Sequence, residues 1–180
     1  MRTTKTNLLC DPQMDVPDGF IRLSGDLERD SIVNGPGLRA VLWTQGCRQH
    51  CPGCQNPETW SESPDVGVLV PIRQVKAELR KLKGQSGITF CGGEPLLQAK
   101  ACLEIARFCK TELGWNVWSF TGLIFEQLPR SGLVWDFVCE LDALIDGPFI
   151  QSQRDLTMKF RGSRNQRILH LDHGKIVSEE

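Results

Sequence analysis

Short apolar runs alternate with amphipathic segments along most of this chain. Four runs have the length and apolar character of buried strands: 38–44, 88–91, 115–120 and 140–146. Weaker strand candidates lie at 19–25 and 167–171, and helical spacing of apolar residues predicts helices over 71–83, about 96–113 and, more briefly, 123–129. Because strands and helices alternate, the pattern favours an α/β fold with a mainly parallel sheet.

Glycine follows each of the four strongest strand candidates within a few residues. In parallel α/β folds, active sites lie at the carboxyl ends of the strands. The segments at these ends are Cys47–Cys54, Gly92-Gly93-Glu94-Pro95, Thr121-Gly122 and Asp146-Gly147. We therefore expect these four segments to share one rim of the sheet.

Length and composition indicate one globular domain of 180 residues. The polar residues 1–18 are expected to form an N-terminal extension, residues 19–171 the domain and residues 172–180 a C-terminal tail. Lys and Arg (21) nearly balance Asp and Glu (22), which argues against a protein that binds nucleic acid or an anionic membrane surface. The chain lacks the roughly 18 consecutive apolar residues of a membrane span and the apolar core of a secretory signal, so a cytoplasmic location is expected.

Three of the eight cysteines lie within eight residues, in the run Cys47-Arg-Gln-His-Cys51-Pro-Gly-Cys54. In a reducing compartment, clustered cysteines are more often metal ligands than disulfides. Pro52 and the glycines on either side favour a loop, in which three thiolates can turn toward one centre. Soft thiolates select zinc, copper(I) or an iron–sulfur cluster. Zinc would take His50 or Cys91 as a fourth ligand, whereas a 4Fe–4S cluster could keep one iron open, so both alternatives stand at this point.

The C-x3-C-x2-C triplet after the first long strand and the GGEP motif (92–95) after a later strand resemble the radical S-adenosylmethionine (SAM) superfamily. More narrowly, the chain is similar to glycyl-radical activating enzymes, in particular those of anaerobic ribonucleoside-triphosphate reductase. The likeness covers about 19–171, and the matching segments outside the two motifs are Asn34–Arg39, Asn56-Pro57, Trp60, Asp146–Phe149 and Arg161–Arg167. The resemblance implies a partial, incomplete TIM-type β/α barrel.

The resemblance also implies roles for individual residues. Cys47, Cys51 and Cys54 would ligate three irons of a 4Fe–4S cluster, and the fourth iron would bind SAM. Gly92, Gly93 and Glu94 would lie against the methionine part of SAM, and Gly53 and Gln55 would approach its adenine or ribose. Thr121 and Asp146 would be further contacts at the rim, and no catalytic residue is implied beyond the cluster and SAM.

The implied reaction is reductive cleavage of SAM, followed by removal of a hydrogen atom from a glycine of a partner protein. The implied partners are a glycyl-radical enzyme, in the first place the anaerobic reductase, and a flavodoxin- or ferredoxin-type electron donor. Pyruvate formate-lyase or another substrate of a radical SAM enzyme is the alternative within this chemistry. A zinc-stabilised binding module without enzyme activity is the alternative outside it, although it leaves GGEP unexplained.

Two features depart from the family pattern or stand outside it. Gly53 and Gln55 occupy positions where relatives often carry aromatic residues, so Trp60 becomes a candidate for stacking on adenine, with core packing as its other interpretation. The segment 154–167 carries five basic residues against one acidic residue, Asp155. Such a run is either a solvated surface or a docking site for the partner enzyme.

Overall fold

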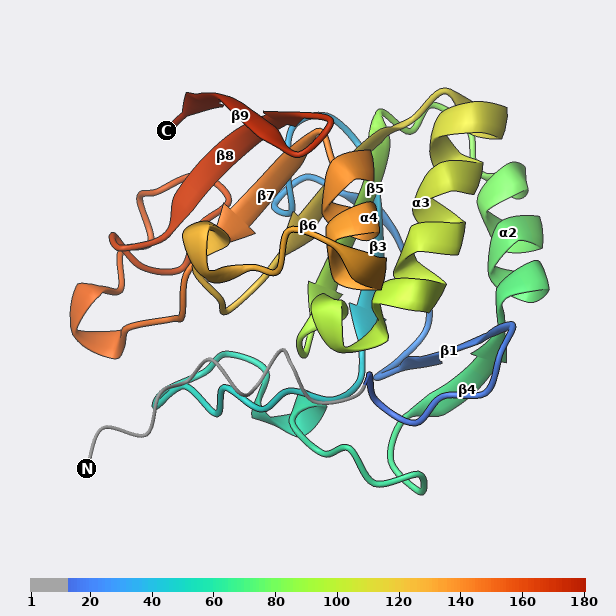
Figure 1. Cartoon of the computed structure of the whole chain (residues 1–180), viewed down its shortest axis with the longest axis horizontal. Helices are drawn as coiled ribbons and strands as arrows, with labels where there is room; N and C mark the ends of the chain where they lie inside the picture. The colour runs from blue at the N-terminus through green and yellow to red at the C-terminus, as the bar shows by residue number, and fades with distance from the viewer. Residues whose placement is uncertain (1–12) are drawn as a thin grey trace.

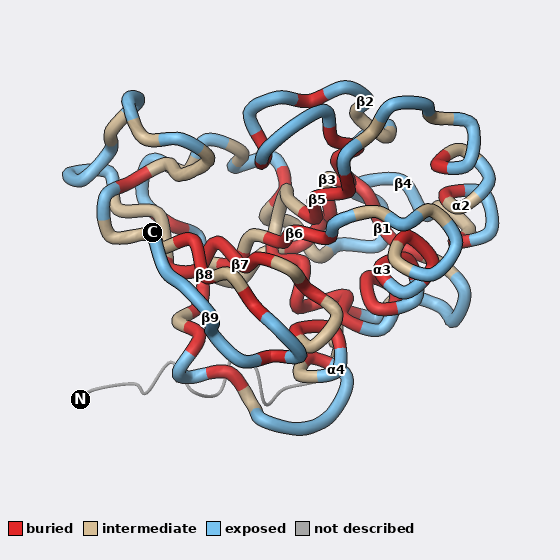
Figure 2. Tube along the Cα trace, turned by 90° about the horizontal axis from the view of Figure 1, so that it is seen from above, coloured by how far each residue is buried: buried red, intermediate tan, exposed pale blue. Residues whose placement is uncertain are grey.

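Four parallel strands form the centre of one nine-stranded sheet in the computed structural model, which describes residues 13–180. These strands are β3 (Arg39–Thr44), β5 (Gly87–Gly92), β6 (Asn116–Phe120) and β7 (Ala143–Asp146). Their register places Thr44 beside Gly92, and Phe120 beside Ile145, so their carboxyl ends lie along one edge. Figure 2 shows that this central part of the sheet is largely buried.

Antiparallel strands extend the sheet on both sides of this centre. They are β1 (Phe20–Leu23), β2 (Glu28–Ser31), β4 (Val68–Pro71), β8 (Arg167–Asp172) and β9 (Lys175–Glu179). The order is β4-β1-β3-β5-β6-β7-β8-β9, with β2 pairing beside β1 on the edge of β3. Within residues 13–180 the two outermost strands, β4 and β9, do not pair with each other, so the sheet is open.

The expectation of a mainly parallel sheet is therefore wrong, because the sheet is mixed. The connection from β8 to β9 is only the pair His173-Gly174, and so short a connection can join only antiparallel strands. The strand β2 has the polar sequence ERDS and β9 is exposed along its whole length. Neither strand carries the apolar alternation by which a strand is predicted from sequence.

Three helices cover one face of the sheet, as Figures 1 and 2 show. They are α2 (Ile72–Lys81), α3 (Ala99–Leu113) and α4 (Gly132–Glu140). Their buried faces form the main core together with the central strands. The opposite face carries a smaller cluster of Trp118, Ala143, Ile145 and Ile168, against which Phe120 and Phe160 pack.

The helix α4 is the main element that the apolar pattern does not predict. A strand was expected over 140–146, but Glu140 ends α4 and the strand begins only at Ala143. Val134, Phe137 and Val138 are buried at helical spacing, yet the helix has only nine residues and runs almost directly into β7. Its apolar residues therefore merge with those of the strand into one apolar stretch.

The two ends of the described chain both contact the domain. Met14 is buried, and its amide donates to the Leu97 carbonyl at 2.9 Å, although most of the expected extension 1–18 lies outside the described residues. The expected tail 172–180 contains β9. The domain boundaries themselves stay a prediction. None of the helices in residues 13–180 is both long and apolar enough to cross a bilayer.

Candidate functional site

A cavity of about 590 Å³ opens at the carboxyl ends of the central strands. Several residues predicted for the site line it: Cys47, Cys51, Cys54, Gln55, Gly92, Gly93 and Thr121. Gly147 and Cys91 line it as well, whereas Gly53, Glu94 and Asp146 do not belong to its lining. The order of strands along the chain therefore brings three cysteines and the diglycine of GGEP to one cavity, as expected for ends of parallel strands.

The cysteine loop is held to the segment that follows it by backbone hydrogen bonds. The Gly46 amide donates to the Thr59 carbonyl at 2.8 Å, and the Cys47 amide donates to the Trp60 carbonyl at 3.0 Å. Arg48 adds a two-point ion pair with Glu62, with N–O distances of 2.7 and 2.8 Å. These contacts hold the loop against the segment 59–62.

Trp60 lies inside this arrangement as well as on the cavity wall. Its ring stacks on His50, with ring centroids 4.8 Å apart and an interplanar angle of 29°. His50 adopts a positive φ of 44°, in the left-handed region that few residues other than glycine occupy. The stack thus stabilises a strained residue between two of the cysteines, which gives Trp60 a structural role beside its predicted contact with adenine.

Burial raises the pKa of two thiols of the cavity wall, those of Cys47 and Cys91. It raises the pKa of Cys47 to about 11, with a further contribution from the charge of Glu94, and it raises the pKa of Cys91 to about 12. Both thiols are therefore protonated at neutral pH in the free protein. Because thiolates are the metal-binding form, a metal group that binds through Cys47 must displace its proton.

Three cysteines on one cavity wall are ligands of the kind that iron–sulfur clusters use. Among residues 13–180, no three His, Cys, Asp or Glu side chains are grouped closely enough to hold one ion. Structural zinc requires four donors around one centre, at about 2.0–2.3 Å. A 4Fe–4S cluster instead attaches each thiolate to a different iron, and the cavity has room for a group of that size. The amide of Asn56 also donates to the Cys54 sulfur at 3.4 Å, a contact of the kind that tunes cluster potentials.

The second glycine of GGEP, Gly93, contacts the cysteine loop so closely that a side chain would not fit there. A Cβ atom on Gly93 would lie 2.2 Å from the Gly46 carbonyl oxygen and 3.0 Å from that of Thr59. Two backbone hydrogen bonds of 2.8 Å complete this contact, from the Gly93 amide to Thr44 and from the Glu94 amide to Gly46. The turn after β5 and the start of the cysteine loop therefore form one backbone unit.

Glu94 connects the ends of β5 and β6 from beneath the cavity. Its buried carboxylate accepts hydrogen bonds from Thr121 Oγ1 at 3.0 Å, from the Gly122 amide at 2.9 Å and from the Leu96 amide at 3.2 Å. Burial nevertheless raises the pKa of Glu94 to about 7. In the structure this carboxyl therefore positions Thr121 and Gly122, which line the cavity directly.

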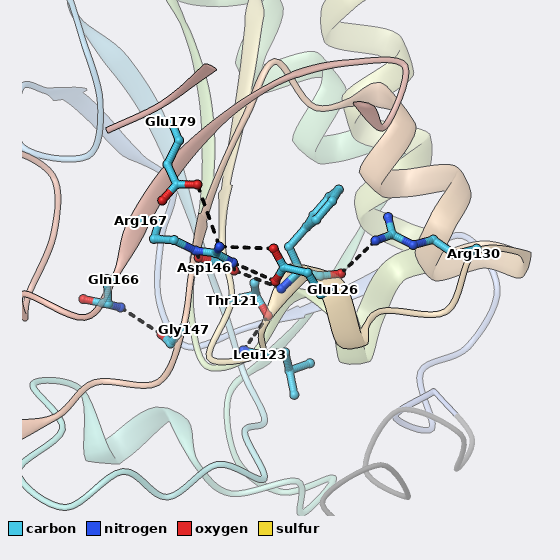
Figure 3. Close-up of polar contacts among 10 residues, drawn as sticks. Thr121, Leu123, Glu126, Arg130, Asp146, Gly147, Gln166, Arg167 and Glu179 are labelled. Carbon is cyan, nitrogen blue, oxygen red and sulfur yellow. Dashed lines mark hydrogen bonds and ion pairs between the residues drawn. The ribbon is translucent and has the colours of Figure 1, made fainter. Parts of the chain in front are cut away.

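Asp146 is engaged by Arg167, as Figure 3 shows. Arg167 Nε lies 2.9 Å from Asp146 Oδ1 and Nη2 lies 2.5 Å from Oδ2, while the Phe125 amide donates to Oδ2 at 2.9 Å. Arg167 also pairs with Glu126 at 2.8 Å, and its carboxylate partners raise its pKa. The carboxylate of Asp146 is thus buried and bound within the protein, and the next residue, Gly147, faces the cavity.

The segment before β8 holds Gly147 and Pro148 in place through side-chain hydrogen bonds. Gln166 Nε2 donates to the Gly147 carbonyl at 3.1 Å, and Asn165 Nδ2 donates to the Pro148 carbonyl at 2.7 Å. Gly53, whose φ is 74°, backs onto this region, since a Cβ there would lie 2.7 Å from the Gln151 side chain. The RGSRNQR motif therefore supports the rim, and only its similarity to a family motif signalled this from the sequence.

Another part of the cavity wall, formed by Glu28 and Trp43, was not predicted from the sequence. Trp43 Nε1 donates to Glu28 Oε2 at 2.7 Å, and both residues line the cavity. Glu28 belongs to the polar strand β2, which carries no sequence signal of a site. Its contribution depends on the antiparallel pairing of β2 with β3, a tertiary contact.

Comparisons with known proteins agree with this geometry. The family model described as a 4Fe-4S single cluster domain matches residues 33–169. The chain is 34% identical over 142 residues to the anaerobic ribonucleoside-triphosphate reductase-activating protein of Vibrio cholerae, covering 76% of this chain and 90% of the relative. It is 34% identical to the protein of that name from Escherichia coli K12, covering 78% and 93%, and 30% identical to the one from enterobacteria phage T4, covering 76% and 86%.

One solved structure shares the fold at low sequence identity. The crystal structure of QueE from Escherichia coli aligns with a TM-score of 0.50 at 14% identity, covering 67% of this chain and 57% of QueE. At that identity the likeness concerns the arrangement of the mixed α/β sheet and its helices alone.

Proposed function

This chain belongs to the family of anaerobic ribonucleoside-triphosphate reductase-activating proteins, and on that basis we propose that it generates a glycyl radical on such a reductase. The observation that carries the proposal is the cavity at the strand ends, which three cysteines and the Gly92-Gly93 turn line together. When bound, a 4Fe–4S cluster and SAM supply the one-electron cleavage of a sulfonium that starts such a reaction.

The cysteine loop has the task of holding the cluster. We assign one iron each to Cys47, Cys51 and Cys54, with the fourth iron left for SAM. The backbone contacts from Gly46 and Cys47 and the Arg48–Glu62 pair keep the loop in place. Pre-organised ligands reduce the free energy cost of ordering the loop when the cluster binds.

The neighbouring strand ends have the task of holding SAM. We assign the methionine part to Gly92 and Gly93, with Glu94 acting from outside the lining through Thr121 and Gly122. We assign the adenine or ribose to Gln55, with Gly53 nearby in the cysteine loop. Thr121 is a further contact, supported by its place on the cavity wall and its bond to Glu94. For Asp146 we favour an indirect role, in which its pairing with Arg167 holds Gly147 at the wall.

Three broader expectations stay part of this proposal. They are the partial barrel form of the fold, the flavodoxin- or ferredoxin-type electron donor and the cytoplasmic location. A sheet with four parallel strands at its centre, and with outer strands that do not pair with each other, is compatible with a partial barrel.

The test is anaerobic reconstitution followed by incubation of the reduced protein with SAM. We expect about four irons per chain, 5′-deoxyadenosine as product and a glycyl radical signal in electron paramagnetic resonance once the reductase is added. Cys51→Ala should abolish the cluster. Cys91→Ala, at another cysteine of the same cavity wall, should keep the cluster and is the matched control.

Two results would contradict the proposal. A chain that binds zinc stoichiometrically and no iron would favour a zinc-stabilised module. A radical formed on pyruvate formate-lyase but not on the reductase would assign the chain to a different partner enzyme.

A further inference from the structure

Large aliphatic side chains from two distant segments of the chain are exposed on the wall of the cavity. Ile32 and Val33 are 69% and 68% exposed, and Leu156 is 78% exposed. All three line the same cavity as the cysteines, although Leu156 is more than 120 residues away along the chain. Exposed aliphatic residues grouped around a cavity indicate an interaction surface, whereas single ones scattered over a surface do not.

The two segments that carry these side chains are anchored to the same residue, Trp118. The guanidinium of Arg39 lies 5.3 Å from the Trp118 ring centroid, and Phe160 packs edge-on against that ring at 5.8 Å. Arg39 belongs to the strand that follows Ile32 and Val33, and Phe160 follows Leu156 by four residues. A residue that follows each aliphatic segment therefore contacts the same side chain of the central sheet.

Further hydrogen bonds hold each segment in place. On one side, Thr89 Oγ1 donates to the Asn34 carbonyl at 2.7 Å, directly after Val33. On the other side, Asp155 Oδ1 accepts from the Thr157 amide at 2.9 Å, around Leu156. The aliphatic side chains are thus presented by segments with defined backbone contacts.

The basic residues of the segment 154–167 are mostly bound within the protein. Arg164 pairs with Asp155 at 2.9 Å, Arg167 pairs with Asp146, and Arg161 Nη1 donates to the Glu180 carbonyl at 2.7 Å. The basic residues on the cavity wall are Lys159 and Arg161, and neither forms an ion pair within residues 13–180, although Arg161 Nη1 is hydrogen-bonded as just described. The cavity wall therefore combines three exposed aliphatic side chains with positive charge from Lys159 and Arg161 only, since the paired arginines of the segment lie outside the lining.

We propose that Ile32 and Val33 on one side, and Leu156 on the other, form an apolar clamp that docks the glycine-bearing segment of the partner reductase. This inference rests on the proposed function, because it concerns the protein on which the radical is made. A glycine has no side chain to recognise, so a site that selects one must bind the backbone and the flanking residues. The clamp selects a segment whose glycine is flanked by apolar side chains, and the basic run contributes little to binding.

The test measures binding to the reductase by biolayer interferometry, with the reconstituted protein and two variants. The double variant Ile32→Ser/Val33→Ser and the variant Leu156→Ser should each weaken binding by about tenfold or more, because serine removes the apolar surface that docking would bury. Val177→Ser is the matched control, because Val177 is 63% exposed on β9 and lies outside the cavity lining. The control should bind within about twofold of the unchanged protein.

Salt dependence separates apolar docking from docking by charge. Apolar contacts change little between 50 and 300 mM salt, so binding should change by less than about threefold. A steep fall in affinity with salt, together with unchanged binding by the serine variants, would assign docking to the basic run and overturn the clamp.

Two further readouts separate the clamp from the proposed function. Iron content, and 5′-deoxyadenosine formed in the absence of reductase, should match the unchanged protein in every serine variant. An unchanged protein that neither cleaves SAM nor binds the reductase would overturn the proposed function, and the clamp with it. An unchanged protein that does both, alongside serine variants that bind equally well, would overturn the clamp alone.

Photo-crosslinking identifies the docked segment directly. A benzophenone side chain introduced at position 156 should crosslink to a reductase peptide that contains the radical glycine, and one introduced at position 177 should not. A crosslink from position 156 to a reductase peptide remote from that glycine would contradict the clamp.

Discussion

Arg167 binds both carboxylate oxygens of Asp146, with Nε 2.9 Å from Oδ1 and Nη2 2.5 Å from Oδ2. The pair joins the first residue of β8 to the last residue of β7, which leads directly into Gly147 on the cavity wall. Its strength comes from burial, since the Asp146 side chain is only 1% exposed. The site therefore depends on an ion pair outside the cavity lining.

Removal of this arginine should destabilise the whole domain. Arg167→Leu leaves the Asp146 carboxylate buried without its charge partner, and we expect the free energy of unfolding to fall by about 3–5 kcal/mol. Urea denaturation measures this change. The control is Arg164→Leu, because Arg164 is 73% exposed and solvent screens its pair with Asp155, so this variant should lose little stability. Equal losses in both variants would show that burial does not set the strength of the Asp146 pair.

A side chain at Gly93 should separate the two loops that form the cofactor site. In Gly93→Ala the new Cβ meets the Gly46 carbonyl oxygen at 2.2 Å, so the backbone must shift. We expect a loss of stability of about 1–3 kcal/mol and a reduced iron content after reconstitution. Gly25→Ala is the matched control, since nothing lies within 4 Å of a Cβ there and its φ is not positive. Full iron content in Gly93→Ala would refute the close contact.

The ion pair between Arg48 and Glu62 should protect the cluster more than it stabilises the fold. Both side chains are about one-third exposed or less, so Glu62→Gln should cost only about 0–1 kcal/mol in unfolding free energy. Because this ion pair holds the cysteine loop, loss of the same free energy should make the loop open more often. The decay of cluster absorbance in air should therefore become about two- to fivefold faster. Glu78→Gln, which breaks surface pairs with Lys81 on α2 and with Arg29, is the control and should leave the decay rate unchanged. Identical decay in both variants would contradict the proposed role of this pair.

Burial of Glu94 should make the stability of the cluster-free protein depend on pH. The pKa of Glu94 is about 7 in the folded protein, against about 4.5 for an ordinary glutamate, so the folded state binds more protons between these values. The contribution of Glu94 is therefore present below about pH 4.5 and is lost as pH rises through about 7, by up to about 3 kcal/mol.

Urea denaturation of the cluster-free protein at pH 5 and pH 8 measures this contribution. Glu94→Gln keeps a hydrogen-bonding side chain but cannot titrate, so the difference in stability between the two pH values should become smaller in this variant. An unchanged difference would assign the pH dependence to other groups.

Periodicity of apolar residues predicted the centre of the fold well. The strands β3, β5 and β6 and the helices α2 and α3 each bury a continuous face, so their pattern is visible in the sequence. The strands β2 and β9 form because they pair with neighbours and not because they bury apolar side chains. No local pattern marks such strands, and for that reason the mixed character of the sheet was missed.

The same division applies to the candidate site. The spacing of Cys47, Cys51 and Cys54 and the ends of the strands predicted which residues come to one cavity. The partners of Glu94 and Asp146 lie 21 or more residues away along the chain, apart from the nearby Leu96 amide, and depend on how the strands pack. The sequence therefore identified residues that meet at the strand ends, but it could not tell which carboxylates were already engaged within the protein.

The contact between Gly93 and Gly46 bears on what happens to the protein after its cluster is lost. It consists of peptide groups alone, so it persists when oxygen destroys an iron–sulfur cluster. We expect the protein that has lost its cluster to keep the backbone arrangement of the cluster site. Reassembly of the cluster would then need iron, sulfide and electrons, but no refolding of the polypeptide.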